Sequence, residues 1–249
     1  MRGERILQLM VVVCACVFLQ TSSLYADDRK SEYLDLRRLI GKEKFKDAIE
    51  RCKELIEKYP DYFYLYETLA EVSQYAGDLD NAMKYFEKRI EEGREVGLTY
   101  YGLARVNDYK KNYRSAVLLY HKATEFGVDV PECYRDYEYA YEKFEGLESA
   151  IRYFSSLCHR NPENANYWYS FALAYWGKDD LGKTIQCLEE ALLRRKGEAK
   201  YLEAKMGASF LHGPAVALSD LRDRLLPLAH ERADIDGAQF LQFYLSYSY

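Results

Sequence analysis

A regular spacing of small residues constrains the fold of this chain more than any other feature. Four alanines stand 34 residues apart, and one further step reaches Thr184; the alanines are Ala48, Ala82, Ala116 and Ala150. An apolar or aromatic residue follows each of the five by four places: Cys52, Phe86, Tyr120, Phe154 and Leu188. Residues four apart share one face of a helix, and self-similarity at this period is typical of stacked helix-turn-helix units. The sequence therefore predicts an all-α chain of repeated helix pairs.

The period divides the chain into units that each hold a helix A, a short turn and a helix B. Residues that tolerate tight backbone angles mark the turns at 77–78, 111–112 and 145–146. Pro60 and Pro162 stand where helix B of a unit should end. The predicted units are 29–62, 63–96, 97–130, 131–164 and 165–198.

Helix A of the fifth unit shows the clearest family pattern. It contains Trp168, Phe171, Ala172 and Tyr175, which resembles the tetratricopeptide repeat (TPR) pattern of Trp, two residues, Leu-Gly, two residues and Tyr, with Phe-Ala in place of Leu-Gly. Residues 29–198 as a whole resemble the TPR family. The resemblance implies a right-handed α-solenoid whose helices A line the concave side.

The C-terminal part is expected to continue the stack. A degenerate sixth unit is predicted at 199–232, with its turn at 213–214, and a C-terminal helix at 233–249. The end of this helix is strongly apolar, with Phe240, Leu241, Phe243, Tyr244 and Leu245. Such a helix either caps the solenoid or pairs with another chain, and capping is favoured because a single apolar helix usually buries within its own chain.

The N-terminus indicates export. Residues 1–26 have two early arginines, an apolar core at 6–19 and a small residue, Ala26, which is the layout of a secretory signal peptide. This core is shorter than the roughly 20 residues needed to span a bilayer. Residues 13–16 also resemble a lipoprotein box, with Cys16 as the lipidated residue. We therefore expect a periplasmic or secreted protein cleaved after Ala26, or alternatively a membrane-anchored lipoprotein.

Composition narrows the possible partners. The chain has 35 basic and 40 acidic residues, a net charge of −5, so it lacks the basic excess with which proteins neutralise nucleic-acid phosphates. Export permits disulfides, but the cysteines after residue 26 have no CxxC spacing and are interpreted as buried small hydrophobes. Three sets of disulfide pairings remain possible among these four cysteines, which are Cys52, Cys133, Cys158 and Cys187.

One segment matches a nucleotide-binding motif. Gly177–Thr184 fits the phosphate-binding pattern G-x-x-x-x-G-K-[ST]. A true phosphate-binding loop follows a strand, whereas the preceding residues have helical spacing, and Asp179 and Asp180 would repel a nucleotide. We therefore interpret the segment as a turn within the fifth unit.

No other sequence pattern indicates catalysis or metal binding. The four histidines lack ligand-like spacing, and no Gly-x-Ser-x-Gly elbow is present. The sequence predicts no catalytic residue, no cofactor and no metal, hence a protein that is not an enzyme.

The predicted binding surface is the concave side. Tyrosine and arginine suit recognition because they combine a large contact area with a polar group. The predicted partner-binding residues lie beside the packed face of each helix A: Tyr64, Tyr75, Tyr101, Arg105, Tyr109, Arg135, Tyr139, Tyr169 and Trp176. The alternative is that these aromatic residues fill gaps between neighbouring units. The first two units lack the lysines and asparagines with which some TPR proteins bind a C-terminal carboxylate.

These observations predict an exported, non-enzymatic scaffold or adaptor of the cell envelope. It would bind a peptide or protein segment in the concave groove, around Tyr101, Arg105, Tyr109, Arg135 and Tyr139. The alternative function is self-assembly, in which the apolar C-terminal helix makes a homo-dimer. A membrane is expected as a partner only if Cys16 is lipidated.

Overall fold

The computed structural model describes residues 28–94 and 96–212, and these residues form helices joined by short turns. Residues 28–41 are helical. The helices that follow are α2 (Phe45–Lys58), α3 (Phe63–Ala76), α4 (Leu79–Glu91), α5 (Val96–Tyr109), α6 (Tyr113–Glu125), α7 (Pro131–Glu145), α8 (Leu147–Arg160), α9 (Ala165–Gly177), α10 (Leu181–Arg194) and α11 (Ala199–His212). The expectation of an all-α chain is confirmed for this part of the molecule.

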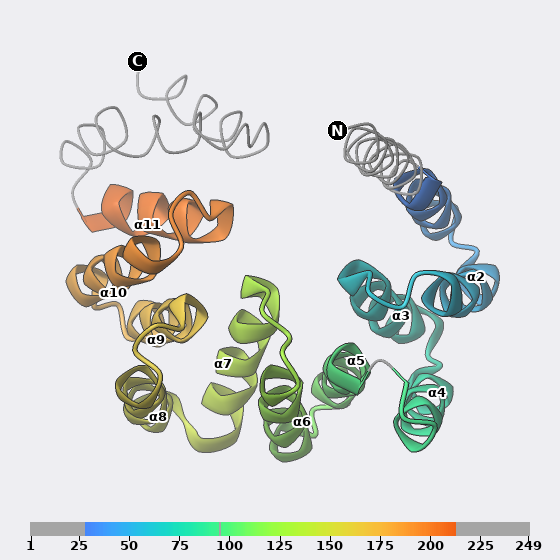
Figure 1. Cartoon of the computed structure of the whole chain (residues 1–249), viewed down its shortest axis with the longest axis horizontal. Coiled ribbons are helices and arrows are strands. Elements are labelled where there is room, and N and C mark those ends of the chain that lie inside the picture. The colour runs from blue at the N-terminus through green and yellow to red at the C-terminus, as the bar shows by residue number, and fades with distance from the viewer. Residues whose placement is uncertain (1–27, 95, 213–249) are drawn as a thin grey trace, which may run out of the picture.

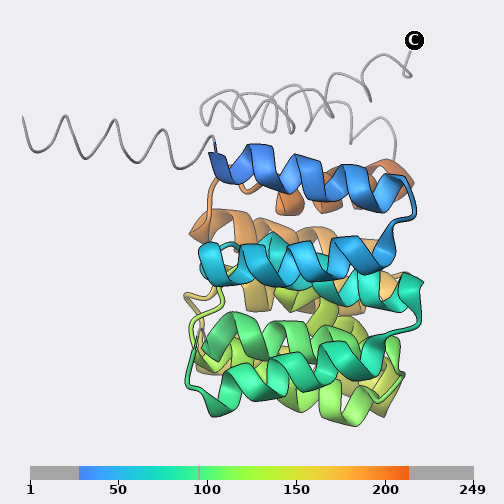
Figure 2. The same cartoon turned by 90° about the vertical axis from the view of Figure 1, so that its right-hand side faces the viewer.

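The helices form an open arc. Figure 1 shows residues 28–41 and α11 at the two ends, with α3, α5, α7 and α9 on the inner side and α4, α6, α8 and α10 on the outer side. Seen from the side in Figure 2, most helices run side by side along nearly the same direction. The inner helices are the helices A of the predicted units, and the outer ones are the helices B. The arc therefore has a concave surface, defined here as the surface lined by residues 28–41, α3, α5, α7, α9 and α11.

The spaced small residues lie where the two helices of a unit meet. Ala48, Ala116, Ala150 and Thr184 have no exposed surface, and Ala82 is almost fully buried. The residues four places later in each unit are also fully buried. A small side chain allows two helix backbones to approach closely, while its larger neighbour fills the space between consecutive units. This repeated contact is the physical reason for the 34-residue period seen in the sequence.

Helix A ends in the same way in four units. The first or second residue after the helix has a left-handed backbone, with φ between 56° and 68°, at Glu43, Gly77, Lys111 and Asp179. In each case the next amide donates to a carbonyl five residues earlier, as Asp78 does to Ser73 at 2.8 Å. This is a Schellman motif, which satisfies carbonyls that the helix leaves without partners. Only one of the four positions has glycine, the residue that adopts this conformation without steric cost.

The match to a phosphate-binding loop is one of these turns. Gly177 ends α9, Leu181 begins α10, and a helix rather than a strand precedes the segment. Asp180 caps α10, because its side chain accepts a hydrogen bond from the Lys183 amide at 3.2 Å. A carboxylate therefore occupies a backbone amide that a bound phosphate would need.

Several expectations lie outside the described residues. They are the signal peptide at 1–26 with Cys16, the turn at 213–214, the second half of the unit at 199–232, and the C-terminal helix at 233–249. Among the described helices, none has the length and apolar character to span a membrane.

Candidate functional site

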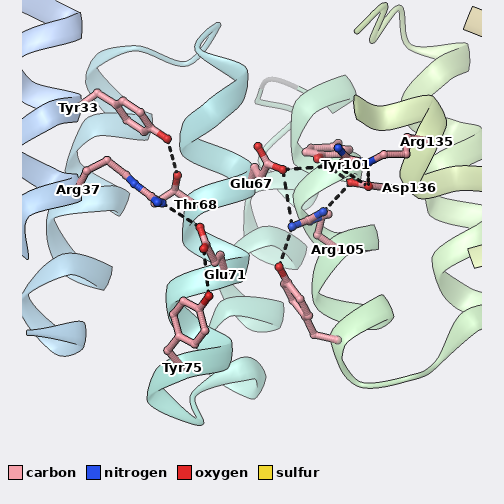
Figure 3. A network of polar contacts seen from close by, with 11 residues as sticks. Tyr33, Arg37, Glu67, Thr68, Glu71, Tyr75, Tyr101, Arg105, Arg135 and Asp136 are labelled. Carbon is pink, nitrogen blue, oxygen red and sulfur yellow. Dashed lines mark hydrogen bonds and ion pairs between the residues drawn. The ribbon is translucent and has the colours of Figure 1, made fainter. Parts of the chain in front are cut away.

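Polar side chains link consecutive helices A along the concave surface. The hydroxyls of Tyr33 and Thr68 are hydrogen-bonded at 3.1 Å. Arg37 donates to Glu71 at 3.0 Å, and Tyr75 donates to the same carboxylate at 3.2 Å. Figure 3 shows these contacts beside a second group on α3, α5 and α7. Partners 34 or 35 residues apart in the chain thus lie next to each other on the inner side.

The second group is called here the polar cluster, and Asp136 is at its centre. Its members are Glu67, Tyr101, Arg105, Arg135 and Asp136 (Figure 3), together with Tyr109, whose hydroxyl accepts a hydrogen bond from Arg105. Oδ2 of Asp136 accepts hydrogen bonds from Arg105 at 2.6 Å and from the Tyr101 hydroxyl at 3.1 Å. Oδ1 accepts two more from Arg135, at 2.9 and 3.0 Å. One carboxylate on α7 therefore binds two arginines and a tyrosine from two helices.

The charges of the polar cluster balance. Oε1 of Glu67 lies 3.7 Å from Nη2 of Arg105 and 4.0 Å from Nη2 of Arg135. Two guanidinium groups therefore face two carboxylates. Burial raises the pKa of Glu67, and the charge of Arg105 opposes that rise. Because the arginines have partners on both α3 and α7, the cluster fixes three consecutive units relative to one another.

Two predicted groove residues are buried and cannot present their rings to a partner. Tyr101 has no exposed surface, and its ring centroid lies 4.6 Å from that of Phe63. Tyr169 is also buried, with its ring centroid 5.0 Å from that of Tyr201. For these two residues the prediction of direct partner contact is wrong, because neighbouring units in the stack cover them. Tyr101 instead supports the polar cluster through its hydroxyl.

The other predicted groove residues reach the surface to differing degrees. Tyr64 is 44% exposed, Tyr75 56% and Tyr139 45%. The Arg135 side chain is also exposed, whereas Tyr109 and Trp176 are half-buried. Arg105 is largely buried in the polar cluster, where it donates to the Tyr109 hydroxyl at 2.7 Å.

An open cavity lies between α7, α9 and α11. Its volume is about 440 Å³, and we refer to it as the α7–α9–α11 cavity. Its lining residues are Arg135, Glu138, Tyr139, Tyr169, Leu173, Trp176, Lys200, Glu203 and Ala204. Four of the predicted groove residues are among them. Arg135 belongs both to this cavity and to the polar cluster, so the two features are continuous along the concave surface.

Asp136 and Glu138 are two residues of the site that were not predicted from the sequence. Each nevertheless had a signal in the repeat. Asp136 follows Tyr101 by 35 residues, as Thr68 follows Tyr33. Glu138 stands at a repeat position that holds alanine in the second, third and fifth units.

The described residues offer little for bond-making chemistry. No group of three or more His, Cys, Asp or Glu in this part of the chain could hold a metal ion. The four described cysteines are free and buried. Burial raises the pKa of Cys158 and of Cys187 to about 12, so both thiols stay protonated and unreactive at neutral pH.

Comparisons with known proteins return solved TPR structures. YrrB, a TPR protein with an unusual peptide-binding site, is 17% identical over 77% of this chain and 97% of its own, with a TM-score of 0.39. A tetratricopeptide repeat protein from Parabacteroides merdae is 13% identical over 78% and 77%, with a TM-score of 0.42. The TPR2AB domain of yeast Sti1, in its pHSP90 complex, is 16% identical over 90% and 100%, with a TM-score of 0.39. No family model and no curated protein matches the sequence.

The fold is defined by the chain's own geometry. Pairs of helices follow one another at a 34-residue period. A small buried residue marks each helix contact, and helix A ends in the same motif in four units. The described residues are therefore an α-solenoid with the tetratricopeptide repeat fold.

Proposed function

We propose that this protein is a non-enzymatic interaction scaffold whose concave surface binds a peptide or a segment of another protein. The observation that carries the proposal is the set of exposed tyrosines next to the polar cluster. The polar cluster joins α3, α5 and α7. Tyr64 lies on α3 and Tyr139 on α7, on either side of α5. Exposed aromatic side chains beside arginine are the groups that most often dominate binding energy at interfaces.

The polar cluster supports the proposal through its rigidity. A surface that is already ordered before binding loses less conformational entropy when the partner arrives. Arg105 and Arg135 each have two carboxylate neighbours, on α3 and on α7. The tyrosines on these helices therefore keep a fixed separation, which favours recognition of one extended segment.

The outer side provides a matched control. Leu118 on α6 and Leu193 on α10 are 60% and 68% exposed. They are large exposed residues, like Tyr64 and Tyr139, but belong to helices on the opposite side of the arc (Figure 1).

The test compares two double variants by affinity capture from cross-linked cells. We expect Tyr64→Ala with Tyr139→Ala to lose the partners that the unaltered protein captures. Leu118→Ala with Leu193→Ala should retain them. Circular dichroism and thermal unfolding establish that both variants are folded. Equal capture by the two variants would reject the concave surface as the binding site.

We also propose that the protein is exported and works in the cell envelope. The support is the signal-peptide pattern of residues 1–26. Mass spectrometry of protein purified from its native host gives the N-terminus directly. A chain that begins at Asp27 indicates cleavage after Ala26, and a lipidated Cys16 indicates a membrane anchor. A chain that retains residues 1–26 would contradict export by either route.

Self-assembly is the second candidate function. The apolar run at 240–245 is the observation that favours it. Light scattering of the protein with and without residues 235–249 separates a homo-dimer from a monomer. A monomer in both preparations would discard this candidate.

A further inference from the structure

Glu138 on α7 occupies a repeat position that is apolar in every other described unit. Steps of 34 residues in both directions reach Leu36, Ala70, Ala104, Ala172 and Met206. All five are buried in the core of the solenoid. Glu138 is also buried, with 5% of its surface exposed. The fourth unit therefore has a carboxyl group where the fold itself requires only a small or apolar side chain.

The carboxyl group of Glu138 has no partner within the described residues. Its Oε1 is shielded from solvent and makes no hydrogen bond. Burial, with a contribution from the charge of Glu142, raises the pKa of Glu138 to about 8. Lys143 opposes that rise, but its ammonium group is bonded to Glu142 at 2.9 Å. A buried carboxyl group without a partner is costly, and either a proton or a cation relieves that cost.

The other charges around the α7–α9–α11 cavity already have partners. Arg135 is bonded to Asp136 at 2.9 Å. Lys200 lies 3.7 Å from Glu203. Glu138 is therefore the one carboxyl group among the lining residues that has neither a hydrogen bond nor an ion pair in the described part of the chain. The titratable and charged groups that surround it are Arg135, Tyr139, Glu142 and Lys143 on α7, Tyr169 on α9, and Lys200 and Glu203 on α11.

The walls of the cavity suit a cation. Tyr139, Tyr169 and Trp176 line it together with Leu173 and Ala204. Aromatic faces attract ammonium and guanidinium groups, and the attraction grows when the cation is desolvated. A Cβ atom at Gly207 would lie 2.8 Å from the Trp176 ring, so the indole packs directly on the backbone of α11. The volume of about 440 Å³ has room for one long side chain.

We propose that the α7–α9–α11 cavity receives one cationic side chain, an arginine or a lysine of the bound segment, with Glu138 as its counter-ion. This inference rests on the proposed function, because it assigns a residue class to one subsite of the concave surface. Glu138 supplies the negative charge, the rings of Tyr139 and Trp176 lie beside the cation, and Leu173 with Ala204 contacts its aliphatic stem.

Binding of a cation is coupled to release of a proton. Glu138 must be ionised to pair with the cation, and in the free protein it is mostly protonated at neutral pH. The affinity for a cation therefore rises with pH up to about the pKa of Glu138 and then levels off. From pH 6.5 to pH 8 the ionised fraction of a group with a pKa near 8 increases by about fifteenfold, and the affinity should increase with it.

The experiment uses agmatine, which carries a guanidinium group and an ammonium group at the two ends of a butyl chain, and N-butylurea, a neutral compound that lacks both charges. Each is titrated into the full chain between pH 6 and pH 9, with binding followed by the NMR signal of the Trp176 indole. We expect saturable binding of agmatine that tightens by about fifteenfold from pH 6.5 to pH 8, and no binding of N-butylurea.

Two variants assign the effect to Glu138. Glu138→Gln keeps the size of the side chain and should lose both agmatine binding and its pH dependence. Glu138→Ala installs the residue that three other units carry, so it should fold and should also lose binding. Glu87→Gln, at an exposed position on α4, should behave like the unaltered protein.

The outcomes separate this inference from the proposed function. Agmatine binding that survives Glu138→Gln, or that does not change with pH, overturns the subsite. Failure of agmatine to bind the unaltered protein overturns it as well. If partner capture still depends on Tyr64 and Tyr139 in either case, the scaffold function stands and only the subsite is rejected.

Discussion

Tyr101 on α5 donates a hydrogen bond to Asp136 on α7 at 3.1 Å, across 35 residues of sequence. Both side chains are buried. The same offset links Tyr33 to Thr68. It recurs between Asn166 and Tyr201, where the tyrosine comes second. Consecutive units are thus connected by buried polar contacts as well as by apolar packing, and the contact at Asp136 is the one on which two arginines also converge.

Removing the Tyr101 hydroxyl should destabilise the protein. Tyr101→Phe keeps the ring packing but leaves Asp136 with one buried donor fewer, at an expected cost of about 1–2 kcal/mol in the free energy of unfolding. Urea unfolding measures this cost. Tyr64→Phe is the control, because Tyr64 is exposed and should change little. A Tyr101→Phe variant as stable as the unaltered protein would show that the hydrogen bond contributes nothing.

Removing the charge of Asp136 should cost more. Asp136→Asn leaves two arginines facing only Glu67, and loss of one partner from a largely buried ion pair typically costs roughly 3 kcal/mol or more. Urea unfolding again gives the free energy. Asp80→Asn removes the carboxylate of an exposed pair with Lys110, which should cost much less than the change at Asp136, because solvent screens exposed ion pairs. Equal costs at the two positions would contradict the central role given to Asp136.

Glu138 should make the protein less stable as the pH rises. Its pKa is about 8 in the folded state, against about 4.3 in an unfolded chain. Between these values the folded state binds the extra proton, so the free energy of unfolding falls with increasing pH. Glu138→Ala removes this dependence and should be more stable than the unaltered protein by roughly 4–5 kcal/mol at pH 8.

Thermal and urea unfolding at pH 5, 6.5 and 8 test that dependence. The difference between the two proteins should grow steadily across this range. Burial also raises the pKa of Asp108 to about 6, so Asp108 contributes to the pH dependence of stability as well. Because both proteins contain Asp108, its contribution cancels in the difference between them. Stability curves that stay parallel from pH 5 to pH 8 would mean that Glu138 has a partner in solution.

Replacing the residues with a left-handed backbone at the end of helix A by glycine should stabilise the protein. Lys111 and Asp179 have φ of 60° and 62°, where a side chain costs about 1 kcal/mol relative to glycine. We expect Lys111→Gly and Asp179→Gly each to raise the melting temperature. Lys84→Gly, in the middle of α4, should lower it, because glycine inside a helix costs about 1 kcal/mol. A lower melting temperature in all three variants would argue against the turn geometry.

The period of small residues was sufficient to predict the fold. Each alanine at the 34-residue spacing sits at a helix contact that must be made again in every unit. Ala48 and Ala150 therefore carry the same information about their units, although they lie at distant points of the arc. A packing contact that recurs at a fixed interval can be recognised in a single sequence, because each unit needs a small residue at the same position.

The site was less predictable because it depends on contacts between units. Helical periodicity placed Tyr101 and Tyr139 on the same face, but the neighbouring unit covers Tyr101 and leaves Tyr139 exposed. The stacking of units, and not the pattern within one helix, decides that difference. Asp136 and Glu138 were missed for a related reason: their importance lies in partners, or the lack of partners, on other helices.

Site-specific photo-cross-linking tests the concave binding surface most directly. The photoreactive residue benzoylphenylalanine is introduced in separate experiments at Tyr64, Tyr139, Leu118 and Leu193, and the cells are irradiated before the tagged protein is purified. We expect a partner to be cross-linked from Tyr64 and Tyr139, on the inner helices, and not from Leu118 or Leu193, on the outer ones. Cross-links from the outer positions alone would contradict this expectation.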